Sequence, residues 1–234
     1  MATTSIAQRL KRSLADSAGT IVFGMEDGTV SIFGLIFGVA ATTTSSTAVL
    51  VAGASGAAAA AVSMMAGVYL DAETSRDEIK AKRARLQAEL ALNPTSIAAA
   101  LSSRLAAAGL APGPSAALAG AVKNDPEALD ALMFALQSGP EVPSDPGEQA
   151  LWMLLADFFA AAVPIVPFVL LPIAQARLVS AAVTIALLVA LGAARARIAR
   201  RSLTRTIVET VAIGIAAALA GVGIGMLIDR WFGG

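Results

Sequence analysis

Residues 28–70 read GTVSIFGLIFGVAATTTSSTAVLVAGASGAAAAAVSMMAGVYL, which is 43 consecutive residues without a formal charge. A helix needs about 20 apolar residues to cross a bilayer, so this stretch is long enough for two membrane spans. The polar run TTTSST at 42–47 lies near its middle and marks the turn between them. These residues therefore predict a helical hairpin in a membrane.

Three more uncharged stretches follow in the second half of the chain, at 158–176, 178–194 and 210–228. The composition agrees with further spans, because 56% of the residues are apolar and 15% are charged, whereas ordinary globular proteins carry about 25% charged residues. We therefore expect an all-α integral membrane protein with five transmembrane helices. Their predicted bounds are about 19–43, 47–71, 149–172, 175–195 and 206–229.

The first residues predict a surface helix and not a cleaved signal peptide. Residues 4–17 have the amphipathic spacing of a helix at a membrane interface, and two carboxylates lie inside the first span. The Lys and Arg distribution sets the orientation, because 15 of the 17 fall in or beside the N-terminus, residues 72–148 and residues 196–205. We expect these three regions to be cytoplasmic and the C-terminus to lie outside.

Residues 72–148 predict a small helical domain between spans two and three. Pro and Gly divide this Ala-rich segment into a continuation of span two through Glu89, a helix at about 94–109 and a helix at about 125–138. A segment of about 70 residues buries little core alone, so we expect it to pack on a second copy of the chain. The predicted domains are an amphipathic helix (1–18), spans one and two (19–71), the cytoplasmic domain (72–148) and spans three to five (149–234).

The composition excludes several kinds of chemistry. The chain has no His and no Cys, which removes disulfides, imidazole and thiolate metal sites, and His- or Cys-based catalysis. Its 17 basic residues balance 17 acidic ones, so the chain has no basic excess for binding nucleic acid. Nucleotide-binding and zinc-hydrolase motifs are absent, and we expect neither an enzyme nor a resident cofactor.

Four carboxylates in the predicted spans require an explanation, because a charge at the centre of a bilayer costs about 2.5 to 3.5 kcal/mol. They are Glu26, Asp27, Asp157 and Glu209. Glu209 lies one helical turn from Arg205, so a structural ion pair explains it. Asp27 has small and oxygen-bearing neighbours in the sequence but no cation. We interpret Asp27 as an ion or proton site.

Met64 and Met65 lie in span two at a depth comparable to that of Asp27. A Met side chain is usually core filler, but a thioether beside a carboxylate places a soft ligand next to a hard one. This combination suits late first-row divalent ions better than Mg²⁺ or Ca²⁺. Asp27 and Met64 therefore predict a path for a transition-metal ion, with Glu26 and Met65 as their neighbours on it.

Pairs of glycine four residues apart allow helices to approach closely in lipid. They occur at Gly24/Gly28, Gly34/Gly38 and Gly221/Gly225. The sequence leaves two interpretations open, because these pairs fit either a seam between two copies of the chain or packing within one copy.

Three motifs resemble the vacuolar iron transporter family: DGTVSIFGL at 27–35, SMMAGVYL at 63–70 and PIVPF at 164–168. The resemblance runs along the whole chain in order, with two spans before and three after a cytoplasmic helical domain. It implies a homodimeric antiporter in a bacterial inner membrane that exchanges protons for Fe²⁺, and often Mn²⁺, leaving the cytoplasm. It also implies that Asp27 is the carboxylate on the ion path and that Met64 is the thioether opposite it.

The chain departs from the family pattern in its acidic residues. Residues that resemble remnants of the family's cytoplasmic metal site are Glu73, Glu78, Glu89 and Met133. Hard cations need several oxygen ligands, so we expect this domain to serve mainly as a dimerising scaffold. The positions at which relatives carry further acids hold Gly56, Val68, Thr95 and Gln137.

These departures leave two alternatives to a divalent-metal exporter. The first is a family member that has lost transport and serves as a structural or accessory membrane subunit. The second is a transporter of a different cation, in which Glu26 and Asp157 form a replacement site.

Overall fold

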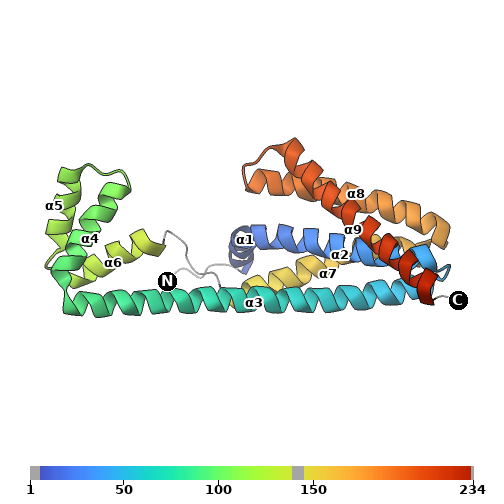
Figure 1. The fold of residues 1–234 in the computed structure, drawn as a ribbon, viewed down its shortest axis with the longest axis horizontal. Coiled ribbons are helices and arrows are strands. Elements are labelled where there is room, and N and C mark those ends of the chain that lie inside the picture. The colour runs from blue at the N-terminus through green and yellow to red at the C-terminus, as the bar shows by residue number, and fades with distance from the viewer. Residues whose placement is uncertain (1–5, 139–144, 233–234) are drawn as a thin grey trace. The chain divides into compact units, whose positions relative to one another are not determined.

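The computed structural model describes residues 6–138 and 145–232, and every regular element within these ranges is an α-helix. The chain divides into a first unit, Met1–Leu70 with Ser144–Gly234, and a second unit, Asp71–Pro143. Figure 1 shows the helices in chain order. They are α1 (Ile6–Asp16), α2 (Ala18–Thr42), α3 (Ser46–Leu92), α4 (Pro94–Ala107), α5 (Pro112–Val122), α6 (Pro126–Ser138), α7 (Pro146–Leu170), α8 (Ile173–Ile198) and α9 (Leu203–Phe232).

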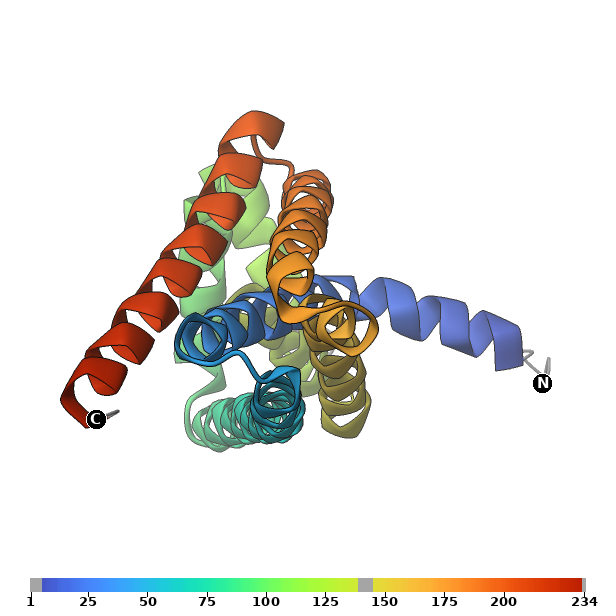
Figure 2. The same cartoon turned by 90° about the vertical axis from the view of Figure 1, so that its right-hand side faces the viewer.

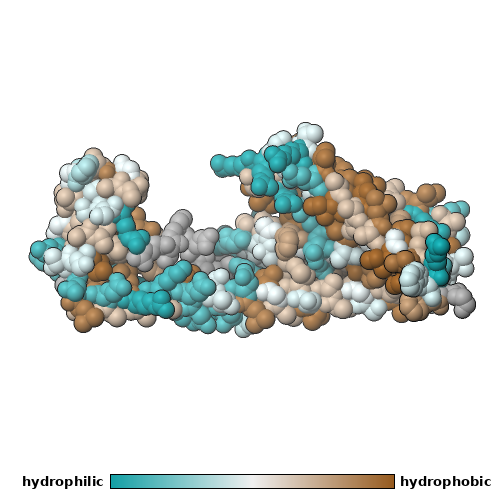
Figure 3. All heavy atoms as spheres, in the orientation of Figure 1, coloured by the Kyte–Doolittle hydropathy of each residue, from teal (hydrophilic) through white to brown (hydrophobic). Residues whose placement is uncertain are grey.

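Five of these helices, α2, α3, α7, α8 and α9, are long and apolar enough to cross a membrane. They confirm the five predicted spans, and the protein is a multi-pass, all-α membrane protein. Helix α3 extends well beyond the span predicted at 47–71, because it continues without a break to Leu92. Hydrophobic atoms cover much of the surface of α9, whereas hydrophilic atoms gather at the turn between α8 and α9 (Figure 3).

Helix α2 lies at the centre of the first unit, with α3, α7, α8 and α9 around it (Figure 2). The core beside it contains Ile32 and Ile36 from α2, Val49 from α3 and Phe168 from α7, all of which are buried. Each of these apolar side chains faces another helix of the same unit, so α2 is held on several sides. The residues of α2 are therefore placed by their neighbours more firmly than those of any outer helix.

The glycine pairs pack within one copy of the chain. A Cβ atom at Gly34 would lie 2.9 Å from the carbonyl oxygen of Ala217, and one at Gly38 would lie 2.7 Å from that of Gly221. Gly24 approaches Met153 of α7 in the same way. These contacts bring the backbone of α2 close to those of α9 and α7, so the glycine pairs serve helix packing inside the chain.

Helix α1 matches the amphipathic helix predicted at 4–17, of which residues 4 and 5 lie outside the described residues. Ser13 of α1 accepts a hydrogen bond of 2.7 Å from the indole nitrogen of Trp152 on α7. The basic side chains of this helix, Arg9, Lys11 and Arg12, are exposed. The polar contact between Ser13 and Trp152 holds α1 against α7, at the end of the unit where α2 begins.

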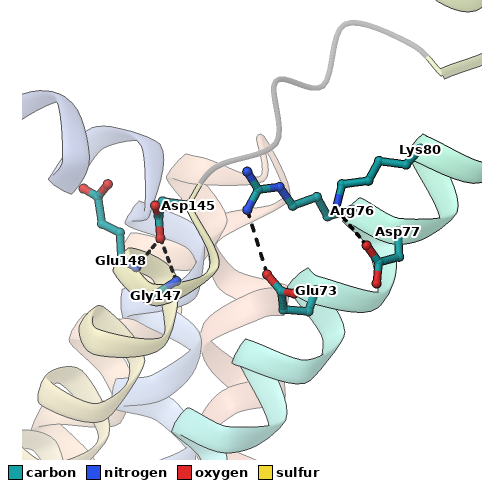
Figure 4. Close-up of polar contacts among 7 residues, drawn as sticks. All are labelled: Glu73, Arg76, Asp77, Lys80, Asp145, Gly147 and Glu148. Carbon is teal, nitrogen blue, oxygen red and sulfur yellow. Dashed lines mark hydrogen bonds and ion pairs between the residues drawn. The ribbon is translucent and has the colours of Figure 1, made fainter. Parts of the chain in front are cut away.

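Polar side chains also cap helix ends in the first unit. Arg177 donates hydrogen bonds to the carbonyl oxygens of Ala40 and Thr43, at the C-terminal end of α2. Asp145 accepts hydrogen bonds from the backbone N–H groups of Gly147 and Glu148, at 2.8 and 3.3 Å, where α7 begins (Figure 4). Both contacts satisfy backbone groups that have no partner inside their own helix.

The second unit contains the C-terminal part of α3 together with α4, α5 and α6. Leu86, Leu101, Leu129 and Met133 form its buried core. The sequence predicts three helices here, whereas the described residues contain a fourth, α5, because the Pro112-Gly113-Pro114 stretch begins a helix and is not only a break. Proline is tolerated in the first turn of a helix, where its missing N–H would have no acceptor, and α5 begins at Pro112.

Candidate functional site

Glu26 and Asp27 lie on α2 about two turns after its first residue, Ala18. Both residues are partly buried. They face a cavity of about 460 Å³ between three membrane helices of the first unit. Its lining comes from α2 (Gly19, Val22, Phe23, Glu26, Asp27, Val30), α8 (Arg195, Ile198, Ala199) and α9 (Thr210, Ile213). Four polar side chains, two of them carboxylates, therefore share one largely apolar cavity.

Both carboxylate oxygens of Glu26 have partners in this cavity. Its Oε2 atom lies 3.3 Å from Nη1 of Arg195, and its Oε1 atom accepts a hydrogen bond of 3.2 Å from the hydroxyl of Thr210. The Glu26 side chain is 12% exposed, whereas that of Arg195 is 40% exposed. One carboxylate thus connects α2 to both α8 and α9.

Asp27 differs from Glu26 because it has no hydrogen bond or ion pair with any residue in the described ranges 6–138 and 145–232. Its carboxylate lines the same cavity as the Glu26–Arg195 pair. A carboxylate inside a membrane segment normally pairs with a cation or marks an ion or proton pathway. Asp27 therefore has the chemistry needed to bind a cation that enters this cavity.

Asp157 lies on α7 and is fully buried. Neither of its carboxylate oxygens has a hydrogen-bond partner among the described residues. It packs against α2 at Gly28, where a Cβ atom would lie 3.0 Å from Oδ1 of Asp157. Asp157 thus packs beside the residue that follows Asp27, but it does not line the cavity that contains Glu26 and Asp27.

Met64 and Met65 lie on α3 and are half-buried. Helix α3 contacts α2 where Gly56 meets Ile32 and Leu35, and where Gly53 meets Ile36. Met64 lies about two turns beyond Gly56 along α3, in the direction of the start of α2. The cavity beside Asp27 is lined from α2, α8 and α9. Met64 and Met65 do not line it, so this cavity does not bring the predicted pair of Asp27 and Met64 together.

Glu209 forms the ion pair predicted from the sequence. Nε of Arg205 lies 2.9 Å from Oε1 of Glu209, one turn along α9. Both side chains are substantially exposed, at 82% and 40%. The contact explains Glu209 as a surface pair and gives it no part in the cavity.

The acidic residues predicted as remnants of a metal site are spread along α3 in the second unit. Glu73 pairs with Arg76, a contact drawn in Figure 4, and Glu78 pairs with Lys82. The N–O distance is 3.9 Å in both pairs. Glu89 is exposed. In the described part of the chain, no group of three or more acidic residues is arranged to hold a metal ion.

Met133, the fourth predicted remnant, is buried in the core of the second unit. Near it, Nη2 of Arg83 lies 3.4 Å from Oδ2 of Asp130, and the Arg83 guanidinium lies 5.2 Å from the centre of the Phe134 ring. An arginine of α3 therefore supplies the positive charge beside the one buried carboxylate among the described residues of this unit.

Sequence reasoning did not find the roles of Arg195, Thr210, Arg83 and Asp130. The Glu26–Arg195 pair had one available signal, because Glu26 lies inside a span and Arg195 at the end of another. Their separation of 169 residues hid the contact, since the order of helices around α2 is a property of the folded chain.

The sequence profile of the VIT family matches residues 18–226, which include α2, α3, α7 and α8, most of α9, and the second unit. The chain belongs to the VIT family. Its VIT match confirms the resemblance noted in the sequence motifs and extends over most of the chain.

Three VIT relatives are similar to this chain at low identity. One is "Vacuolar iron transporter 1" of Eucalyptus grandis, 28% identical over 213 residues, covering 89% of this chain and 85% of the relative. Another is "Vacuolar iron transporter 1" of Tulipa gesneriana, 29% identical over 208 residues, covering 88% and 84%. A third is "Vacuolar iron transporter 1" of Arabidopsis thaliana, 29% identical over 166 residues, covering 70% and 66%.

Proposed function

We propose that the protein is a divalent transition-metal transporter that exports Fe²⁺ or Mn²⁺ from the cytoplasm in exchange for protons. One observation carries the proposal: Asp27 is an unpaired carboxylate on a central membrane helix and lines a cavity among the membrane helices. The VIT relatives named as iron transporters support the choice of cargo. In this proposal the protein is a transporter and has no enzymatic activity.

Asp27 binds the metal ion when it is ionised and releases it when it takes up a proton. One carboxylate thereby serves both coupling partners, since the same oxygen atoms accept either the proton or the metal. Met64, on the helix beside α2, supplies a thioether that favours late first-row ions over Mg²⁺ and Ca²⁺. Met65 neighbours Met64 on this path, and Glu26 neighbours Asp27.

In the proposal, the protein lies in a bacterial inner membrane with its N-terminus in the cytoplasm and its C-terminus outside. The basic residues support this orientation, because those of α1, of the second unit and of the α8–α9 turn belong on one side by the alternation of five spans. In this arrangement a cytoplasmic ion reaches Asp27 from the end of the unit where α2 begins.

Two copies form a homodimer in the proposal, with the second unit as a scaffold. Its small size favours packing on a partner. Its acidic side chains support a structural role, because Glu73 and Glu78 already lie beside basic residues and Glu89 is solitary and exposed. Transport then depends on Asp27 and not on metal collected by this unit.

The test is uptake of Fe²⁺ and Mn²⁺ into proteoliposomes, with and without an imposed pH gradient. We expect metal flux that depends on the gradient in the wild type and is lost in Asp27→Asn, which keeps the shape of the side chain and removes its charge. Asp16→Asn is the matched control, because Asp16 is exposed at the end of α1. Flux in Asp27→Asn equal to that of the control would contradict the proposal.

The same assay addresses the accessory-subunit alternative. If the folded wild-type protein moves neither ion and purifies with a different membrane protein at constant stoichiometry, the accessory-subunit alternative replaces the transporter proposal. The different-cation alternative predicts that Glu26→Gln with Asp157→Asn abolishes cation flux. The structure favours the Asp27 proposal over it, because Glu26 is occupied by Arg195 and Asp157 lies outside the cavity lining.

A further inference from the structure

We propose that Arg195 is a resident counter-ion of the cation site, which neutralises Glu26 and thereby sets the charge that a divalent ion meets at Asp27. The inference rests on the proposed function, in which Asp27 binds the transported cation. It assigns Arg195 as a positioning residue that lowers the affinity of the site, and it gives Glu26 the task of holding the arginine away from Asp27.

Two adjacent carboxylates, Glu26 and Asp27, line one cavity but differ in their contacts. Glu26 is held by Arg195 at 3.3 Å and by Thr210 at 3.2 Å. Asp27 lines the same cavity and has no hydrogen bond or ion pair within the described part of the chain. The single guanidinium in the lining is therefore directed to the carboxylate that is not proposed to carry the ion.

The charge of the cavity follows from these contacts. Two carboxylates and one guanidinium give the lining a net charge of about −1, whereas the same lining without Arg195 would carry about −2. Apolar side chains, including Val22, Phe23 and Ile213, form most of the remaining wall. Because such a wall screens charges less than water does, the charge of Arg195 is felt at Asp27.

Arg195 is the arginine of the α8–α9 region that lines this cavity. Arg197, Arg200 and Arg201 are exposed and do not line it, and Arg205 pairs with Glu209. Arg195 lies in the last turn of α8, where a cation also interacts favourably with the helix dipole. This placement holds it at the mouth of the cavity, half-buried, with its guanidinium on Glu26.

The two partners of the ion pair then have opposite effects on cation affinity. Removing the arginine charge leaves Glu26 free beside Asp27, so a divalent ion is attracted more strongly. Removing the glutamate charge frees Arg195 within reach of the remaining carboxylate, so the ion must compete with it. Removing both charges returns the lining to about −1 and restores the original affinity.

The experiment is equilibrium binding of Mn²⁺ to purified full-length protein in lipid nanodiscs at fixed pH and ionic strength. We expect Arg195→Gln to lower the Kd about tenfold, Glu26→Gln to raise it about tenfold, and the double variant to lie within about threefold of the wild type. Arg197→Gln is the matched control, because it removes an equal charge from the same last turn of α8 at an exposed position outside the cavity. Elution as a single folded species checks each variant.

A structural role alone predicts a different pattern. If the pair only holds α2 against α8, both single variants weaken binding or leave it unchanged, and such a result in folded protein overturns the inference. A loss of binding in Asp27→Asn, together with equal Kd values for Arg195→Gln and Arg197→Gln, would also overturn it while leaving the proposed function intact. Wild-type protein that binds no Mn²⁺, or binds it equally after Asp27→Asn, would overturn both.

Discussion

Gly28 shows how closely the residue after Asp27 is packed. A Cβ atom at this position would collide with the backbone carbonyl oxygen of Asp157 on α7. Backbone atoms cannot move aside as the end of a flexible side chain can, so α2 and α7 would have to separate. Gly28 therefore fixes both the distance between the two helices and the position of Asp27 beside it.

We predict that Gly28→Ala lowers the stability of the protein by about 1 to 3 kcal/mol, the usual cost of overpacking, and reduces transport. Gly67→Ala is a matched control, since Gly67 is also in a membrane helix but has nothing within 4 Å of an added Cβ. There the gain in helix propensity, up to about 1 kcal/mol, should raise stability slightly. Thermal unfolding of both variants in the same detergent makes the comparison, and equal unfolding temperatures would contradict the packing argument.

Replacing Asp157 should raise the stability of the protein, in contrast to Gly28→Ala. Its carboxylate is fully buried, and both oxygens have no partner among the described residues. An uncompensated buried charge or polar group is costly, so Asp157→Asn should raise the unfolding temperature by a few degrees, equivalent to about 1 kcal/mol. Asp16→Asn, on the exposed surface of α1, should leave it unchanged. A lower unfolding temperature for Asp157→Asn would show that the carboxylate has a stabilising partner.

The C-terminal end of α2 is held by a side chain from another helix. Its last turn leaves carbonyl oxygens without partners inside the helix, and Arg177 of α8 donates to two of them, on Ala40 and Thr43. Hydrogen bonds to a charged group contribute about 1.5 to 3 kcal/mol each. Arg177 thereby connects two membrane helices through backbone atoms that would otherwise be unsatisfied.

We predict that Arg177→Gln lowers stability by about 2 kcal/mol. Arg230→Gln removes the same charge from the exposed last turn of α9, at the same end of the unit, and should have little effect. Chemical unfolding in mixed micelles, followed by Trp fluorescence, compares the two. A smaller loss in Arg177→Gln than in Arg230→Gln would mean that the contacts with α2 do not stabilise the helix end.

Most elements were predictable because each depends on a local signal in the sequence. The five spans follow from long gaps between charges, and α1 follows from its amphipathic spacing. Helix α5 was missed because a Pro-Gly-Pro stretch fits either a break or a helix start, and only packing against α4 and α6 decides between them. The candidate site is also predictable only in part. Asp27 can be found in the sequence as a charge inside a membrane span. The pairing of Arg195 with Glu26, and not with Asp27, depends on how three helices distant in the sequence pack together.

At the scale of the molecule, the first unit has two ends with different charge. α1, the start of α7 and the α8–α9 turn lie at the end where α2 begins, and they carry many of the basic residues of this unit. The α2–α3 turn and the start of α8 lie at the other end, where Arg177 and Arg230 are the basic residues in the described part of the chain. In the proposed orientation the first end faces the cytoplasm, because basic residues favour that side of a membrane.

The absence of cysteine from the sequence makes this assignment directly testable with single introduced cysteines. We predict that Ser96→Cys on α4 and Ser202→Cys at the α8–α9 turn react with a membrane-impermeant maleimide only after spheroplasts are permeabilised. Ala174→Cys, at the start of α8, should react in intact spheroplasts, and all three positions are exposed. Labelling of Ser202→Cys but not Ala174→Cys in intact spheroplasts would invert the topology, and the proposed direction of metal export would then require the ion to reach Asp27 from outside.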